Sequence, residues 1–135
     1  MPGFNDDLVT DIRTNGKVTK GPFVGRSVLV LTTTGARTGE QRTTPLVYSR
    51  DGDRYVIVAS KGGAPTNPAW YHNLRTHPVV QVEIGHERFR ARAHVMPQPE
   101  RRRLYDAHAD INPSFKDYEK RTTRRIPVIV LERLP

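Results

Sequence analysis

The stretch Ser27–Tyr48, SVLVLTTTGARTGEQRTTPLVY, decides how the rest of the chain is expected to fold. Its four consecutive apolar residues at 28–31 predict a strand that is buried on both faces. A break at Gly35 starts a short loop that carries Arg37 and Arg42, and a second apolar run follows that loop. The pattern predicts a buried strand, a cationic loop and a return strand. Because guanidinium groups bind phosphate and carboxylate in a bidentate manner, the loop is suited to holding a polyanion.

The composition predicts one globular domain. The chain has 135 residues, of which 36% are hydrophobic and 27% are charged, as is typical of a folded protein. We expect residues 1–135 to form this domain, with an N-terminal helix and connector in residues 1–25. There is no cysteine, no long apolar run and no secretory leader pattern, so a cytoplasmic protein without disulfides is expected.

The charge balance indicates an anionic partner. Lysine and arginine total 22 against 14 aspartate and glutamate residues, which gives a formal net charge of +8. Nucleic acid, acidic lipid and a multiply charged small molecule are all compatible with this surplus. An ordinary solvated basic surface is the alternative, and composition alone leaves it open.

Periodicity and turn signals predict a mainly β (α+β) fold, a small, mostly antiparallel six-stranded barrel with short flanking helices. The strands are expected at 28–33, 42–50, 55–60, 79–84, 88–95 and 126–131. Helices are expected at 4–14, 69–77 and 100–109, with a short helical piece ending at 120. Asp51-Gly52-Asp53 predicts a tight hairpin turn, 60–63 a flexible loop, and 101–103 an exposed run of arginines.

Several familiar catalytic and binding motifs are incomplete or absent in the sequence. The glycine loop at 35–39 is followed by Glu40, where a Walker A motif needs its lysine. His86-Glu87 begins like a zinc-protease motif, but Arg90 stands where the second histidine belongs. The five histidines lack metal-ligand spacing, and no serine-hydrolase signature is present, so neither a metal site nor a nucleophilic triad is expected.

What remains is a set of polar and aromatic residues where strands are expected to end. Cations and glycines there could hold an anion, and the aromatic residues could wall an aromatic ligand. Ordinary barrel loops with solvated cations explain the same pattern, and the residues alone leave both readings open. The set comprises Arg37, Thr38, Arg42, Thr44, Ser60, Lys61, Gly62, Trp70, Tyr71 and Asn73.

At these residues the chain resembles the deazaflavin-dependent nitroreductase family, whose members use reduced coenzyme F420 on a split β-barrel related to flavin mononucleotide oxidases. The matching segments cover most of the chain in family order. They are PFVG (22–25), LTTTGARTGEQRTTPL (31–46), DGDRYVIVASKGGAPTNPAWYHNL (51–74), NPSFKDY (112–118) and RRIPVIVLE (124–132). The resemblance implies a cofactor with a deazaflavin ring and a tail that carries one phosphate and several carboxylates.

Carried over position by position, the resemblance also implies the residues that bind this cofactor. They are Arg37, Thr38, Arg42, Thr43, Thr44, Pro45, Leu46, Val58, Ala59, Ser60, Lys61, Ala69, Trp70, Tyr71, His72 and Asn73. Ala36 stands where the family's loop commonly has arginine or lysine, which removes one tail contact.

The reaction that the resemblance implies is hydride transfer to an activated hydrophobic acceptor such as a quinone, an enone or a nitroaromatic compound. We expect Ser60 and Tyr118 to act near the reacting centre, and Asn112, Phe115 and Tyr118 to line the substrate pocket. Asn112 and Phe115 replace tyrosines found in the best-known member, so nitro compounds are not assumed to be substrates.

Two alternatives stay open from the sequence. The first is a split-barrel protein that binds flavin mononucleotide, whose shorter tail would leave part of the cationic set unused. The second is a basic barrel that binds nucleic acid, which is not favoured because no basic strand carries the needed aromatic residues. The short N-terminal helix also leaves open a weak peripheral association with the inner face of a membrane.

Overall fold

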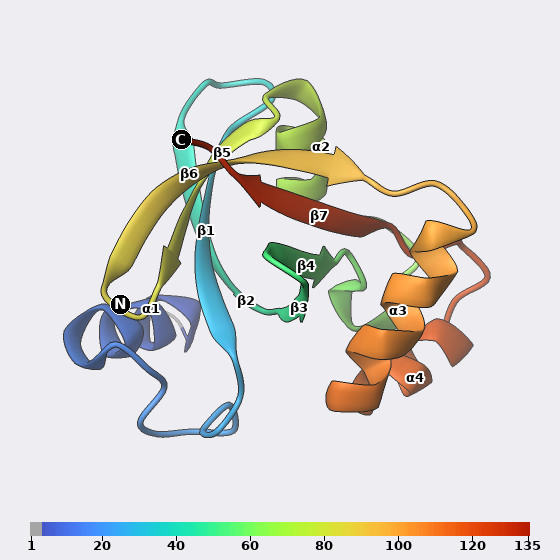
Figure 1. The fold of residues 1–135 in the computed structure, drawn as a ribbon, viewed down its shortest axis with the longest axis horizontal. Coiled ribbons are helices and arrows are strands. Elements are labelled where there is room, and N and C mark those ends of the chain that lie inside the picture. The colour runs from blue at the N-terminus through green and yellow to red at the C-terminus, as the bar shows by residue number, and fades with distance from the viewer. Residues whose placement is uncertain (1–3) are drawn as a thin grey trace.

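The computed structural model describes residues 4–135, in which seven strands form one antiparallel sheet in the order β2-β1-β5-β6-β7-β4-β3 (Figure 1). The strands are β1 (Val28–Thr34), β2 (Gln41–Val47), β3 (Ser49–Asp51), β4 (Arg54–Val58), β5 (Val79–Ile84), β6 (Glu87–Val95) and β7 (Val128–Arg133). The helices of this part of the chain are α1 (Phe4–Asn15), α2 (Ala69–Thr76), α3 (Glu100–Ile111), α4 (Ser114–Lys120) and a 3-10 turn, η1 (Lys61–Gly63). The expected mainly β, antiparallel architecture with flanking helices is confirmed.

The strand count is seven because the expected strand at 42–50 divides at Tyr48. Val47 is the last β2 residue paired with β1, opposite Val28, whereas Ser49 pairs with Val56 of β4. Strands β2 and β3 lie at opposite ends of the strand order, yet only Tyr48 separates them in the chain. The sheet must therefore curl until its two edges approach each other, which makes it a half-barrel.

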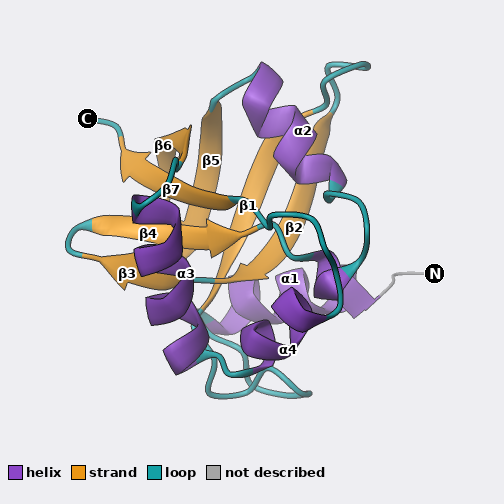
Figure 2. Ribbon diagram, turned by 90° about the vertical axis from the view of Figure 1, so that its right-hand side faces the viewer, coloured by secondary structure: helices purple, strands orange, loops and turns teal. Residues whose placement is uncertain are grey.

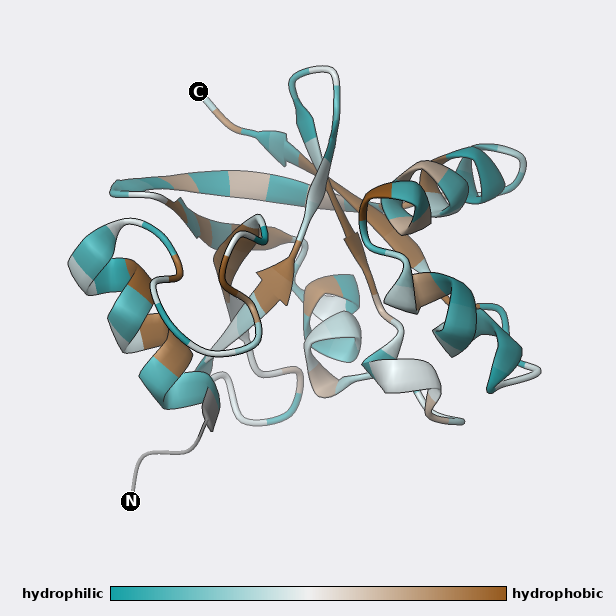
Figure 3. Cartoon of the chain, turned by 90° about the horizontal axis from the view of Figure 1, so that it is seen from below, coloured by the Kyte–Doolittle hydropathy of each residue, from teal (hydrophilic) through white to brown (hydrophobic). Residues whose placement is uncertain are grey.

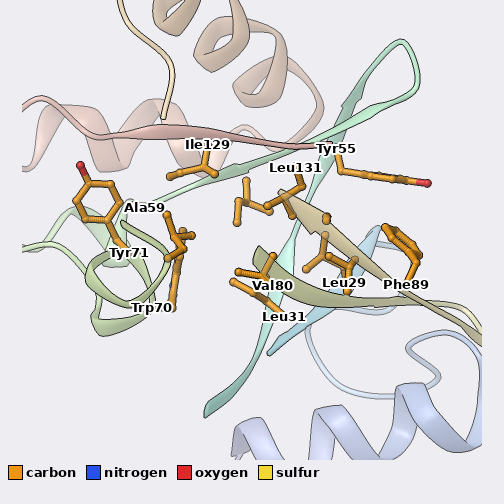
Figure 4. Close-up of a cluster of buried hydrophobic side chains, with 14 residues drawn as sticks. Leu29, Leu31, Tyr55, Ala59, Trp70, Tyr71, Val80, Phe89, Ile129 and Leu131 are labelled. Carbon is orange, nitrogen blue, oxygen red and sulfur yellow. The ribbon is translucent and has the colours of Figure 1, made fainter. Parts of the chain in front are cut away.

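The inner face of the curled sheet encloses one hydrophobic core. Leu29 and Leu31 of β1 meet Ile129 and Leu131 of β7 there, and all four side chains are fully buried. Figure 4 shows this core with Trp70 at one end and aromatic rings at the other. Each such side chain contributes about 1.5–3 kcal/mol by leaving water, so this core is a main source of stability.

Helices cover the outer face of the same strands, which explains why these strands are apolar on both faces. Val30 of β1 packs against α1 through Leu8 and Ile12. Val56 of β4 and Val130 of β7 pack beneath α3 and α4. Figure 2 shows α3 and α4 apart from α2, and Figure 3 shows apolar strands lying between helices with hydrophilic outer surfaces. No helix among residues 4–135 is long and apolar enough to cross a membrane.

The arginine run at 101–103, which the sequence predicted to be exposed, is buried at its first residue. Arg101 is only 5% exposed, and its Nε donates a hydrogen bond of 2.8 Å to the carbonyl oxygen of Ile126. Its guanidinium carbon also lies 5.4 Å from the centre of the Tyr105 ring. Burial lowers the pKa of Arg101 below its usual value. The expectation was wrong here because the helix faces the sheet at this position, and a carbonyl outside regular structure needs a donor there.

Candidate functional site

Two adjoining cavities lie where the expected site residues gather. The loop cavity, about 870 Å³, is lined by Gly35, Ala36, Arg37, Thr38, Arg42, Thr43, Thr44, Ala69, Trp70, His72 and Asn73. The apolar cavity, about 450 Å³, is lined in part by Pro45, Leu46, Val58, Ser60, Lys61, Phe115 and Tyr118. Thr44 and Trp70 line both cavities, so these two side chains form a shared wall. Volumes of this size suit a ligand larger than a drug-sized molecule that extends through both.

The loop cavity is cationic. Arg37 and Arg42 line it, and among residues 4–135 no aspartate or glutamate does. Arg42 forms an ion pair of 3.1 Å with Glu40, but both side chains are more than half exposed, so water screens this pair strongly. The guanidinium groups therefore remain available to an anionic ligand.

Asn73 holds the cationic loop to helix α2. Its Oδ1 accepts a hydrogen bond of 3.0 Å from the backbone N–H of Ala36, and its Nδ2 donates one of 3.2 Å to Thr33 Oγ1. The side chain is 8% exposed, although Asn73 lines the loop cavity. Both ends of the amide thus have partners within the protein, which assigns Asn73 the role of positioning the loop.

We expect Asn73→Ala to lower the free energy of unfolding by about 1–2 kcal/mol, because the Ala36 N–H and the Thr33 hydroxyl both lose their partner. Denaturant titration gives the stability, and amide exchange measured by NMR should show the Ala36 N–H exchanging faster. His72→Ala is the matched control, since His72 is an exposed neighbour that lines the same cavity. An Ala36 amide that exchanges at the wild-type rate in Asn73→Ala would contradict this role.

The segment 60–63, expected as a loop, forms a turn closed by two backbone hydrogen bonds. Gly63 N–H donates to the Ser60 carbonyl at 2.9 Å, and Ala64 N–H donates to the Lys61 carbonyl at 3.1 Å. Ser60 has right-handed helical angles, whereas Lys61 has a φ of 48°, which is uncommon for a residue other than glycine. A right-handed residue followed by a left-handed one directs successive N–H groups into one concavity, an arrangement that binds anions.

The apolar cavity brings together residues that are far apart in the sequence. Asn112, Phe115 and Tyr118, expected at the substrate pocket, all line it together with Ser60 and Lys61. The Phe115 ring packs edge-on against Tyr118, with the ring centres 5.1 Å apart. No hydrogen bond within residues 4–135 engages the hydroxyl of Ser60 or of Tyr118, so both hydroxyls are free to bind a ligand.

Two of the expected cofactor residues line neither cavity. Ala59 is fully buried and Tyr71 is 7% exposed, and both belong to the hydrophobic core inside the sheet (Figure 4). Their contribution to the site is through packing beside Ser60 and Trp70. All the other expected site residues line one cavity or both.

The sequence did not predict that the N-terminal segment forms one wall of the apolar cavity. Phe23 and Arg26 line the apolar cavity, and Arg26 Nη1 donates a hydrogen bond of 3.2 Å to Asn112 Oδ1. This bond joins the connector before β1 to the junction between α3 and α4. The PFVG segment at 22–25 is one of the segments that match the family. This match was the signal that could have identified the segment as part of the site.

Comparison with known proteins agrees with this geometry. The model of the F420H(2)-dependent quinone reductase family matches residues 7–133. A protein of Mycobacterium tuberculosis named F420H(2)-dependent quinone reductase is 46% identical over 123 residues, which cover 89% of this chain and 83% of the relative. A second M. tuberculosis protein, named a putative F420H(2)-dependent quinone reductase, is 36% identical over 103 residues, covering 76% of this chain and 87% of that relative.

Solved structures extend the similarity to the fold. The structure described as F420-H2 dependent reductase FDR-A superposes with a TM-score of 0.73 at 34% identity, covering 79% of this chain and 95% of that one. A structure described as a domain-swapped dimer superposes with a TM-score of 0.74 at 30% identity, covering 93% of this chain and 92% of the other. The family match over 7–133, together with these relatives, shows that the chain belongs to the F420H(2)-dependent quinone reductase family.

Proposed function

We propose that this protein uses reduced coenzyme F420 to reduce a quinone. The observation that carries the proposal is the pair of adjoining cavities, each lined by two cationic side chains and, among residues 4–135, by no aspartate or glutamate. The second cavity adds apolar walls from Leu46, Val58 and Phe115. A polyanionic tail suits the first cavity, and an aromatic ring and a hydrophobic acceptor suit the second. The names of the relatives at 46% and 36% identity support the same assignment.

The donor set fits the cofactor. Arg37 and Arg42 would hold the phosphate and carboxylates of the tail, since a guanidinium presents two parallel donors to each such group. The turn at 60–63 lines the apolar cavity and would offer backbone N–H groups and the Lys61 ammonium to the part of the cofactor that enters it. Trp70, which walls both cavities, would pack against the ring. Flavin mononucleotide, with a shorter tail, would leave part of this cationic set without a partner.

When bound, reduced F420 supplies a hydride, and conversion of a quinone to a hydroquinone takes one hydride and one proton. The chain's role is to position the reactants and exclude water. The free hydroxyls of Ser60 and Tyr118 would donate hydrogen bonds to the quinone oxygen on which negative charge develops. Phe115 and Leu46 supply apolar walls that strengthen these bonds by keeping water out.

The test is a cofactor panel followed by turnover. We expect F420 to bind and to change its fluorescence on binding, and F420H2 to be oxidised only when a quinone such as menadione is added anaerobically. Flavin mononucleotide and nicotinamide cofactors in the same titration are expected to bind far more weakly. Tight binding of flavin mononucleotide without binding of F420 would overturn the proposal.

The double variant Arg37→Gln/Arg42→Gln is expected to raise the dissociation constant of F420 by about tenfold or more at low salt, because two charge-assisted contacts are removed. The difference from the wild type should shrink at high salt, where screening already weakens those contacts. Arg92→Gln is the control, since Arg92 is exposed on β6 and lines neither cavity. Equal salt dependence in the double variant and the wild type would show that the tail does not bind there.

A further inference from the structure

Arg124, in the segment between α4 and β7, makes four hydrogen bonds to the segment 59–67. Its Nη2 donates to the carbonyl oxygens of Ser60 at 2.8 Å and Ala59 at 3.2 Å. Its Nε donates to the carbonyl oxygen of Ala64 at 2.8 Å, and its Nη1 donates to Asn67 Oδ1 at 2.7 Å. One planar guanidinium thus fastens both ends of the turn that carries Ser60 and Lys61.

The partners of Arg124 are all neutral, which separates this contact from an ordinary salt bridge. Burial lowers the pKa of Arg124 below its usual value, and no carboxylate among residues 4–135 pairs with its guanidinium. A lysine could not replace it, because a single ammonium cannot reach acceptors spread over the whole width of a guanidinium fork. The geometry therefore requires arginine.

Fixing these carbonyls also fixes the direction of the N–H groups beside them. In a planar trans peptide the C=O of one residue and the N–H of the next point in opposite directions. Arg124 holds the carbonyls of Ala59 and Ser60, so the N–H groups of Ser60 and Lys61 point away from Arg124. No carbonyl or side chain of residues 4–135 accepts a hydrogen bond from either N–H, and Ser60 and Lys61 line the apolar cavity whereas Arg124 does not.

We infer that Arg124 is a positioning residue that directs the Ser60 and Lys61 N–H groups toward an oxygen of the bound ligand. The inference rests on the function proposed above, in which that ligand is F420H2 together with its acceptor. Arg124 acts from behind the turn, through the peptide groups. The left-handed conformation of Lys61, which is unfavourable for a residue with a side chain, is the conformation that this bonding maintains.

The experiment compares Arg124→Met with Arg125→Met. Both substitutions remove one positive charge, but Arg125 is exposed and makes no hydrogen bond or ion pair within residues 4–135. In the ligand-free protein we expect Arg124→Met to speed amide exchange of Gly63 and Ala64, whose N–H groups close the turn, by about tenfold or more. Arg125→Met should leave these rates unchanged.

Binding and kinetics supply the second readout. Arg124→Met is expected to raise the dissociation constant and the KM of F420H2 by about tenfold, because a loosened turn must be ordered at binding. Arg124→Lys should behave like Arg124→Met although it keeps the charge. Millimolar guanidinium, compared with sodium chloride at equal ionic strength, should partly restore binding to Arg124→Gly.

Wild-type exchange at Gly63 and Ala64 in Arg124→Met, together with wild-type affinity for F420H2, would overturn the inference. Full rescue by Arg124→Lys would overturn it as well, since charge alone would then suffice. If Arg124→Met fails to fold, Arg124→Lys carries the same comparison. If the wild type does not bind F420H2, the proposed function fails, and the exchange rates of the ligand-free protein still decide whether Arg124 positions the turn.

Discussion

Gly63→Ala is expected to destabilise the protein by roughly 3 kcal/mol and to abolish binding of F420. Gly63 has a φ of +85°, and a Cβ at this position would lie 2.8 Å from the Tyr118 carbonyl oxygen and 2.8 Å from Arg121 Cβ. The left-handed conformation alone costs about 1–2 kcal/mol for a residue with a side chain. The contact with a helix carbonyl adds to this cost, because the backbone of α4 cannot yield as the end of a flexible side chain can. The clash is relieved only if the turn and α4 move apart.

Gly62→Ala provides the matched control, one residue away in the same turn. Gly62 has a φ of +64°, but no atom lies within 4 Å of the place that its Cβ would take. We expect this variant to lose only about 1–2 kcal/mol, from the left-handed conformation alone. Denaturant titration and F420 fluorescence should therefore separate the two variants. Equal losses would show that the packing of the turn against α4 is unimportant.

Close packing at Gly63 joins the turn to α4, because a Cβ at this position would lie 2.8 Å from the Tyr118 carbonyl oxygen. Lys61 of the turn and Tyr118 of α4 line the same cavity. We therefore expect substitutions that separate the turn from α4 to change the shape of this cavity.

Local sequence patterns predicted most of the strands and helices. The expected strand at 79–84 matches β5 at both ends, and the strand expected at 28–33 matches β1 to within one residue. The division at Tyr48 was missed because nothing in 42–50 breaks a strand. Strand identity there is set by the pairing partners, β1 on one side and β4 on the other, and these lie elsewhere in the sequence.

The candidate site was predictable in part. Cationic loops, glycines and the family resemblance pointed to Arg37, Arg42 and Lys61. Arg37 and Arg42 line the loop cavity, whereas Lys61 lines the apolar cavity. The roles of Asn73 and Arg124 were not predictable, because each depends on which backbone carbonyl or N–H happens to lie within reach in three dimensions. A single sequence shows which side chains can form hydrogen bonds, but it does not show which backbone groups lie within their reach.

His108 is expected to make the protein lose stability as the pH falls from 6.5 toward 4. The side chain is fully buried, and burial lowers its pKa from 6.5 to about 4. Its Nδ1 lies 2.8 Å from Ser49 Oγ, and its Nε2 has no partner within residues 4–135. The unfolded chain takes up the proton first, so it is stabilised relative to the folded state over this interval. The free energy of unfolding should fall by about 1.4 kcal/mol per pH unit, about 3 kcal/mol in total, and level off below the folded pKa.

The pH window separates His108 from the carboxylates. Hydrogen bonds from Thr19 lower the pKa of Asp11 from 3.8 to about 2, so stability that depends on this group is lost only below its ordinary value. Denaturant titrations between pH 7 and 4.5 therefore report chiefly on His108, and His108→Gln should flatten the slope there. His94→Gln is the control, since this side chain is 42% exposed.

The His108 ring packs edge-on against the Phe115 ring, with the ring centres 4.4 Å apart. Phe115 lines the apolar cavity, so a proton on His108 places a positive charge behind a wall of that cavity. Quinone reduction by the folded protein should therefore weaken only as the pH approaches the folded pKa of about 4. An unchanged stability slope in His108→Gln would show that another group carries the acid sensitivity.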